Sequence, residues 1–140
     1  MNRVVLALGL AIVATPAAAL TCGVDPQAVT FGGYDSLSSA ATDGTGNIHV
    51  VCDASTSFTV TLDGGNGSID DRTMTSGADA LHYNLFSNAS RTAVWGDGNG
   101  ASDVSASGTT VDLPVYGRIP GLQNVPAGTY LDTIAVTVTF

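Results

Sequence analysis

The chain contains no lysine and no glutamate, and its only permanently cationic side chains are four arginines. Twelve acidic residues, all of them aspartate, give a formal net charge of −8 at pH 7. Such a surface repels nucleic-acid phosphates and anionic lipid head groups, so we expect neither as a partner. Because lysine and glutamate favour helices, their absence also argues against extensive helix.

Long hydrophobic runs are scarce, and the clearest one spans residues 4–13. It is shorter than the roughly 20 residues that a membrane-spanning helix needs, which disfavours an N-terminal anchor. Arg3 precedes the run, and small alanines at 17–19 follow it, as at a signal-peptidase site. We therefore expect residues 1–19 to be a secretory signal peptide. Residues 20–140 then form one exported domain, without a transmembrane anchor.

Cysteine is almost absent, with only Cys22 and Cys52 in the chain. In an oxidising compartment the default is a disulfide between them. The alternative, a pair of metal thiolates, is disfavoured because there is no C-x-x-C spacing and His49 and His82 lie in no ligand cluster. We expect no metal and no cofactor.

Glycine, threonine, valine, serine and aspartate are plentiful, which suits short strands joined by tight turns. Turns are expected at residues 43–46, 63–67 and 96–100, and a long surface loop over residues 99–110. This pattern predicts an all-β, immunoglobulin-like sandwich of two sheets. The expected strands are residues 28–34, 47–52, 57–63, 80–86, 92–95, 109–117 and 130–140.

The last eight residues alternate small or hydroxylated with large apolar side chains, and no returning strand follows them. If they end a sandwich sheet, one strand that would cover the core must come from elsewhere. The alternative is an ordinary closed core in which these residues simply pack. The groove left by a missing strand is expected to be lined by Val29 and Phe31 on one flank and by Ile134, Val136, Val138 and Phe140 on the other.

Six segments in order resemble the spore coat protein U domain family, which includes the subunits of archaic chaperone–usher pili: residues 31–35, 46–52, 81–86, 91–98, 114–119 and 127–133. The resemblance implies an incomplete immunoglobulin-like sandwich that lacks its final strand. It also implies a periplasmic chaperone, an outer-membrane usher and a neighbouring subunit that supplies an N-terminal donor strand. Surface fibres, adhesion and biofilm are the implied roles. Structural roles are implied for Tyr83, Asn84, Arg91, Trp95, Gly96, Tyr116, Gly117 and Tyr130.

The chain departs from this family pattern ahead of its first cysteine. Polymerising subunits carry a donor segment there, but only Leu20 and Thr21 separate the expected cleavage site from Cys22. We therefore expect a subunit that accepts a donor strand and does not supply one. Such a subunit belongs at the tip of a fibre or initiates its assembly.

Enzymatic motifs are missing from the sequence. There is no G-x-S-x-G elbow, the lack of lysine excludes an S-x-x-K nucleophile, and neither histidine has the context of a catalytic base. Asp70 and Asp71 could form a carboxylate pair, but neighbouring strand residues point to opposite faces. We expect a protein that is not an enzyme.

The alternative function is a self-contained secreted module that binds a glycan or an ion. Trp95, Arg72 and Arg91 could form a sugar site, although a single tryptophan in a sandwich is usually part of the core and the arginines could pair with nearby aspartates. The Asp/Asn/Gly loops offer oxygen ligands for calcium, but they match neither an EF-hand nor a repeated calcium motif. Turn formation explains the same residues more simply.

Overall fold

The computed structural model describes residues 19–99 and 102–140, so the expected signal peptide lies almost wholly outside the described residues. The described chain contains strands and no helix. Its named strands are β2 (Cys22–Thr30), β3 (Thr42–Leu62), β4 (Arg72–Ser76), β5 (Asp79–Phe86), β6 (Val104–Ile119) and β7 (Val136–Thr139).

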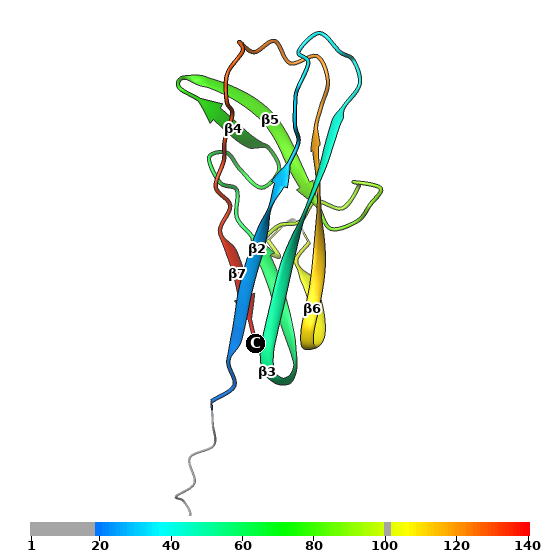
Figure 1. The fold of residues 1–140 in the computed structure, drawn as a ribbon, viewed down its shortest axis with the longest axis vertical. Helices are drawn as coiled ribbons and strands as arrows, with labels where there is room; N and C mark the ends of the chain where they lie inside the picture. The colour runs from blue at the N-terminus through cyan, green and yellow to red at the C-terminus, as the bar shows by residue number, and fades with distance from the viewer. Residues whose placement is uncertain (1–18, 100–101) are drawn as a thin grey trace, which may run out of the picture.

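All strand pairs are antiparallel, in the order β2-β3-β6-β5-β4, with β7 added to β3. β3 and β6 pair over two stretches: residues 42–51 with 110–119, and residues 56–60 with 104–108. Between these stretches the two strands turn together, at the lower end of the molecule in Figure 1. One sheet therefore curls over itself into two layers.

The hydrophobic core lies on the inner face of this curl. Alternation along β3 places Ile48, Val50, Phe58, Val60 and Leu62 inside, each at most 3% exposed. Threonine and serine occupy the outward positions between many of these residues, which gives the period of two that a half-buried strand requires. The outcome is one shared core rather than two separate ones.

The strand expected over residues 92–95 is a prediction that the structure corrects. These residues form no named strand: isolated bridges join Val94 to Phe86 and Trp95 to Ser102, and the Trp95 side chain turns inward to a 1% exposed site. There the indole Nε1–H donates to the Val60 carbonyl at 3.0 Å. Residues 93–95 therefore bond to the end of β5 without forming a regular strand.

The turn expected at residues 43–46 is also wrong, because these residues lie inside β3. Their glycines permit close approach instead of chain reversal. A Cβ atom on Gly46 would lie 2.6 Å from the Gln27 carbonyl oxygen, and one on Gly44 would lie 3.1 Å from Phe31 Cδ1. β2 and the residues after it can therefore pack closely over this part of the sheet.

Several further boundaries differ from the expected ones. The first strand is Cys22–Thr30 instead of residues 28–34, and the strands expected over 47–52 and 57–63 are parts of β3. Residues 72–76 form a strand that the sequence pattern missed, and the expected loop over residues 99–110 contains the beginning of β6. The expected strand over residues 130–140 is regular only in β7. The segment before β7 is held by an isolated bridge between Leu131 and Thr75 and by side-chain bonds.

Candidate functional site

Two edge strands, β2 and β7, both pair with the same edge of β3. β2 pairs with residues 45–52 and β7 with residues 59–62, while β6 lies along the other edge of β3. Because β3 turns between these stretches, β2 and β7 lie at the margins of different layers, near each other in Figure 1. Among the described strands, none pairs with the remaining edge of β2 or of β7. We call the region bordered by these two unpaired edges, with its inward-facing apolar side chains, the β2–β7 groove.

One flank of the groove comes from β7 and the residues beside it. Val136 and Val138 lie opposite buried residues of β3 and point to the same inner face. With Ile134 they pack against the core but remain partly exposed. Phe140, the last residue, is 54% exposed. The structure thus places Ile134, Val136 and Val138 on the inner face, and Phe140 ends the chain beside them.

The other flank begins at the disulfide between Cys22 and Cys52. Cys52 is 5% exposed, and the bridge fastens the start of β2 to β3 as the sequence predicted. Next along β2, Val24 pairs with Val50, whose side chain is fully buried, yet Val24 is 40% exposed. Val24 therefore faces the interior without being covered, and it is a groove residue that sequence reasoning missed.

A register shift between Gln27 and Thr30 reverses which β2 residues face inward. After the shift, Val29 and Phe31 point toward the core, and both are partly buried. The Phe31 ring meets Tyr83 edge-on at 5.9 Å between ring centroids. Phe31 therefore closes the far end of the groove by contacting the opposite wall, whereas Val24 lies in its open part.

Backbone groups on both margins point into the groove. Asp53 N–H donates to the Thr21 carbonyl at 3.0 Å, and Asp63 N–H donates to the Ala135 carbonyl at 3.2 Å, so odd-numbered residues of β2 and β7 bond to β3. In an antiparallel pair, the intervening residues direct their N–H and C=O groups away from the partner. The outward-directed groups belong to Cys22, Val24, Pro26, Val136 and Val138, and Pro26 has no N–H to offer.

The segment leading into β7 is fixed by a cluster of polar contacts around Asp132. The Asp132 carboxylate accepts bonds from the Asn66 N–H at 2.9 Å and from the Tyr83 hydroxyl at 2.6 Å. Burial, followed by the bond to Asp132, raises the pKa of the Tyr83 hydroxyl, which therefore stays protonated as a donor. Backbone bonds between Leu131 and Thr75 at 2.9 and 3.1 Å secure the same segment to β4.

Arg72 lies beneath this segment and is fully buried. Its guanidinium donates to the Asp63 carbonyl at 2.9 and 2.8 Å, to Asn84 Oδ1 at 2.6 Å and to the Trp95 carbonyl at 2.8 Å. Burial lowers the pKa of the Arg72 guanidinium, although Tyr83 and nearby carboxylates such as Asp63 oppose the shift. Arg72 thus joins the end of β3, β5 and the residues around Trp95, and it is not available as a sugar ligand.

Arg91 performs a similar role on the opposite side, from a backbone with φ of 56°. Its guanidinium donates to the Gly117 carbonyl at 3.0 Å and to the Gly44 carbonyl at 3.3 Å, and it lies over the Tyr116 ring at 5.5 Å from the centroid. Asp43 lies 3.6 Å from Arg91 Nε. These contacts fasten the loop of residues 87–93 across β3 and β6.

Two remaining residues of the family motifs also make structural contacts. Gly96 donates its N–H to the Ser102 carbonyl at 2.6 Å and accepts from the Leu62 N–H at 3.1 Å. Tyr130 packs against the core, and its hydroxyl donates to the Pro126 carbonyl at 2.7 Å. Both residues hold loops that border the end of β3 or the segment before β7.

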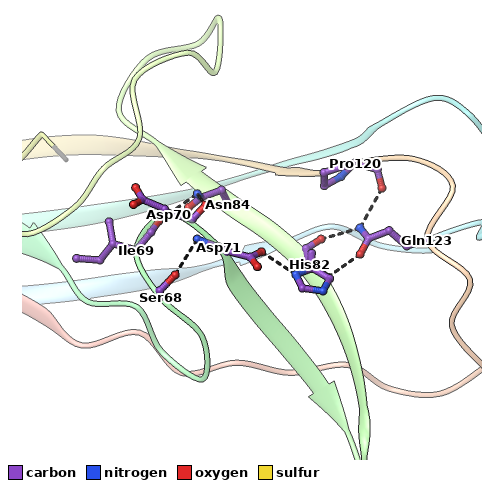
Figure 2. A network of polar contacts seen from close by, with 8 residues as sticks. All are labelled: Ser68, Ile69, Asp70, Asp71, His82, Asn84, Pro120 and Gln123. Carbon is purple, nitrogen blue, oxygen red and sulfur yellow. Dashed lines mark hydrogen bonds and ion pairs between the residues drawn. The ribbon is translucent and has the colours of Figure 1, made fainter. Parts of the chain in front are cut away.

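Figure 2 shows a polar network at the β4–β5 hairpin, where Asp70 and Asp71 have separate roles. Asp71 Oδ1 lies 2.6 Å from His82 Nδ1, whereas the Asp70 backbone oxygen accepts from Asn84 Nδ2 at 3.1 Å. The Gln123 side-chain amide bonds to both the N–H and the C=O of His82, each at 2.8 Å. The two aspartates do not form a catalytic pair, and Gln123 takes the place of a neighbouring strand at this edge of β5.

Within residues 19–99 and 102–140, no group of three or more His, Cys, Asp or Glu is placed to hold a metal ion. In the same part of the chain, no helix has the length and apolarity needed to cross a bilayer. The site with a distinct physical character is therefore the β2–β7 groove, whose apolar side chains and unpaired backbone groups can hold an extended strand.

Comparisons with known proteins agree with this geometry. Protein U of Myxococcus xanthus is 32% identical over 139 residues, covering 89% of this chain and 78% of that protein. A chain in the crystal structure of the CsuC-CsuE chaperone–tip adhesion subunit pre-assembly complex, from the archaic chaperone–usher Csu pili of Acinetobacter baumannii, aligns with a TM-score of 0.62 at 28% identity. That alignment covers 87% of this chain but only 40% of the solved one.

These similarities confirm the predicted fold class, an all-β immunoglobulin-like sandwich. The family resemblance drawn from the six sequence segments is also confirmed, since the Spore Coat Protein U domain matches residues 9–137. The chain belongs to the Spore Coat Protein U domain family.

Proposed function

We propose that this protein is an exported structural subunit of a chaperone–usher surface fibre, and that its β2–β7 groove receives a donor strand from another polypeptide. One observation carries the proposal: β2 and β7 both have an unpaired edge beside inward-facing apolar residues, and among these Val24 is 40% and Phe140 54% exposed. A strand with alternating apolar residues would satisfy both the backbone edges and the side chains.

The free energy gained when a donor strand is inserted is comparable with the net stability of the whole domain. An inserted strand that buries three or four large apolar side chains gains about 5 to 10 kcal/mol. The net stability of a typical domain lies in the same range. The subunit without a donor strand is therefore expected to be marginally stable.

The proposed function involves three partners. They are a periplasmic chaperone that protects the groove, an outer-membrane usher, and a neighbouring subunit that supplies the final donor strand. Similarity to a chain of a chaperone–subunit complex supports the first and third partners. The proposed route is export through a signal peptide at residues 1–19, then the periplasm and finally the cell surface.

We further propose that the subunit accepts a donor strand but does not supply one, which places it at the tip or at the start of a fibre that supports adhesion and biofilm. Cleavage after Ala19 would leave Leu20 and Thr21 ahead of Cys22, too few residues for a donor segment. N-terminal sequencing of the secreted protein tests this position. A mature start well before Ala14 would contradict it.

Adjacent residues of β7 provide a matched pair of variants for the assembly proposal. Val138 faces the groove, whereas Thr137 points outward from the same strand. We expect Val138→Arg to abolish co-purification with the chaperone and to prevent stabilisation by a donor peptide, because a guanidinium would be forced into an apolar row. Thr137→Arg should retain both properties.

This function would be contradicted if the subunit were recovered as a soluble monomer that unfolds cooperatively at a high melting temperature. The same monomer would have to show no response to chaperone or donor peptide. If that monomer melted higher with a neutral glycan or with calcium, the result would favour the self-contained binding module instead.

A further inference from the structure

The two margins of the β2–β7 groove differ in their ability to form hydrogen bonds. We propose that Pro26 is a specificity-determining residue: it interrupts the free edge of β2, so that an incoming strand is fixed by its bonds to β7. This inference rests on the proposed function and concerns the manner in which the groove selects its partner.

The register of β2 places Pro26 on its free edge. Pro26 lies opposite Ile48, two residues along from Val24 opposite Val50. The bond from Asp53 N–H to the Thr21 carbonyl at 3.0 Å fixes the alternation, so the even-numbered residues direct their backbone groups into the groove. At Pro26 that edge presents a carbonyl but no N–H.

Two other features shorten the usable edge of β2. Asp25 places a negative charge beside Pro26, and a register shift begins after Gln27. Proline, charge and bulges are the devices by which edge strands resist pairing with other chains. Only Cys22 and Val24 retain a complete set of outward N–H and C=O groups before this interruption.

The β7 margin has none of these features. Residues 136–139 read Val-Thr-Val-Thr and pair with β3 without a register shift. Val136 and Val138 direct both backbone groups into the groove, and their side chains point to the same interior. This margin can therefore form a continuous ladder with an incoming strand.

The difference between the interrupted edge of β2 and the continuous edge of β7 predicts the direction of the incoming strand. β2 and β7 run in opposite directions in Figure 1, so a strand between them is antiparallel to one and parallel to the other. Antiparallel pairing is the more stable per residue. The edge of β7 is uninterrupted and can form the most hydrogen bonds in an antiparallel pair. The incoming strand is therefore expected to run antiparallel to β7 and to contact β2 mainly through side chains.

The test uses the full chain and a synthetic peptide of alternating threonine and valine with a lysine at each end. Pro26→Ala restores one N–H to the β2 edge, and one hydrogen bond corresponds to roughly a 2- to 12-fold slower peptide dissociation. The restored edge should also increase self-association in sedimentation velocity. Pro114→Ala is the matched control, because Pro114 is another exposed strand proline and lies in β6, away from the groove.

A second measurement uses the unaltered protein and two N-methylated peptides. Residues directly opposite in an antiparallel pair share a face, so valines that enter the groove exchange bonds with Val136 and Val138. Methylation of the valine nitrogens should abolish binding, whereas methylation of the threonine nitrogens should weaken it only slightly.

The outcomes separate the two proposals. If the unaltered protein binds the peptide but Pro26→Ala neither slows dissociation nor increases self-association, the role of Pro26 is overturned and the groove remains a strand acceptor. Equal losses from the two methylated peptides also overturn it. If neither the unaltered protein nor Pro26→Ala binds any of the peptides, the proposed function fails and this inference fails with it.

Discussion

At the scale of single residues, Arg72 is the only buried charged side chain among the described residues. It contacts the end of β3, Asn84 in β5 and the carbonyl of Trp95. A planar guanidinium can reach several acceptors at fixed angles, which a lysine ammonium cannot do. Arg72 thus connects segments that are distant in sequence and that together support the residues before β7.

We predict that Arg72→Lys lowers the free energy of unfolding by about 2 to 4 kcal/mol, because buried carbonyls lose their donors. Urea titration of the subunit in complex with a bound donor peptide provides the measurement. Arg118→Lys is the control, since Arg118 forms an exposed pair with Asp43 at 2.7 Å and should change stability little. Equal losses in the two variants would contradict the role of Arg72.

The acid stability of the domain should depend on two aspartates. The bond from Arg118 holds the pKa of Asp43 below its usual range, and bonds from Asn47 and then His49 do the same for Asp112. A carboxylate whose pKa is depressed by folding stabilises the native state above its unfolded pKa, near 3.9, and this contribution disappears as the pH falls through the folded value.

We therefore predict that these two aspartates leave the melting temperature nearly constant from pH 7 to about pH 5. At pH values below about 4 they should lower it. In Asp112→Asn the fall should be shallower, because one proton-uptake site is removed. Scanning calorimetry across this pH range is the measurement, and an unchanged acid slope in the variant would contradict the assignment.

At the scale of elements, the glycines of β3 and β6 determine how closely the first segment packs. Gly44 and Gly117 lie opposite each other, and a Cβ on Gly117 would approach Phe31 Cζ to 2.6 Å. Phe31 in turn contacts Tyr83. The flat surface at this glycine pair therefore positions the aromatic end of the groove.

Gly117→Ala should displace Phe31 and cost about 1 to 3 kcal/mol of stability, as overpacking does elsewhere. Gly33→Ala is a suitable control, because a Cβ there would meet nothing within 4 Å. Chemical denaturation of both variants tests the prediction. If Gly117→Ala were as stable as the original chain, Phe31 would have free space that the structure does not show.

The alternating pattern of β3 and of the last residues was sufficient to predict the fold class. Val24 could not be found in this way, because the shift after Gln27 reverses the inward parity between Val24 and Val29. The glycines at 44 and 46 were misread as a turn, since local sequence does not reveal which strand will pack against them. Side-chain anchors such as Arg72 depend on distant segments and leave no local periodicity.

At the scale of the whole molecule, strand pairing predicts a gradient of local stability. β3 has paired neighbours on both sides, whereas β2 and β7 each keep one free edge. Amide exchange should be slowest in β3 and in the paired part of β6, and faster at Cys22, Val24, Val136 and Val138. Addition of a donor peptide should slow exchange at Val136 and Val138 most strongly.

Exchange-rate measurements by NMR, with and without peptide, test this gradient. Strong protection of the Val136 and Val138 amides in the lone subunit would indicate that its own chain already covers them.

The family is structural rather than enzymatic, which agrees with the expectation that the chain is not an enzyme.

The shared pairing of β2 and β7 with one strand has a mechanical consequence. A tensile load that enters through a strand held against β7 passes by backbone hydrogen bonds into β3, and the same covalent segment carries it to β2 and, through the Cys22–Cys52 bridge, toward the start of the domain. The side-chain interior between the layers is not part of this force path. A fibre built from such units could therefore resist pulling through its backbone while its core stays unstressed.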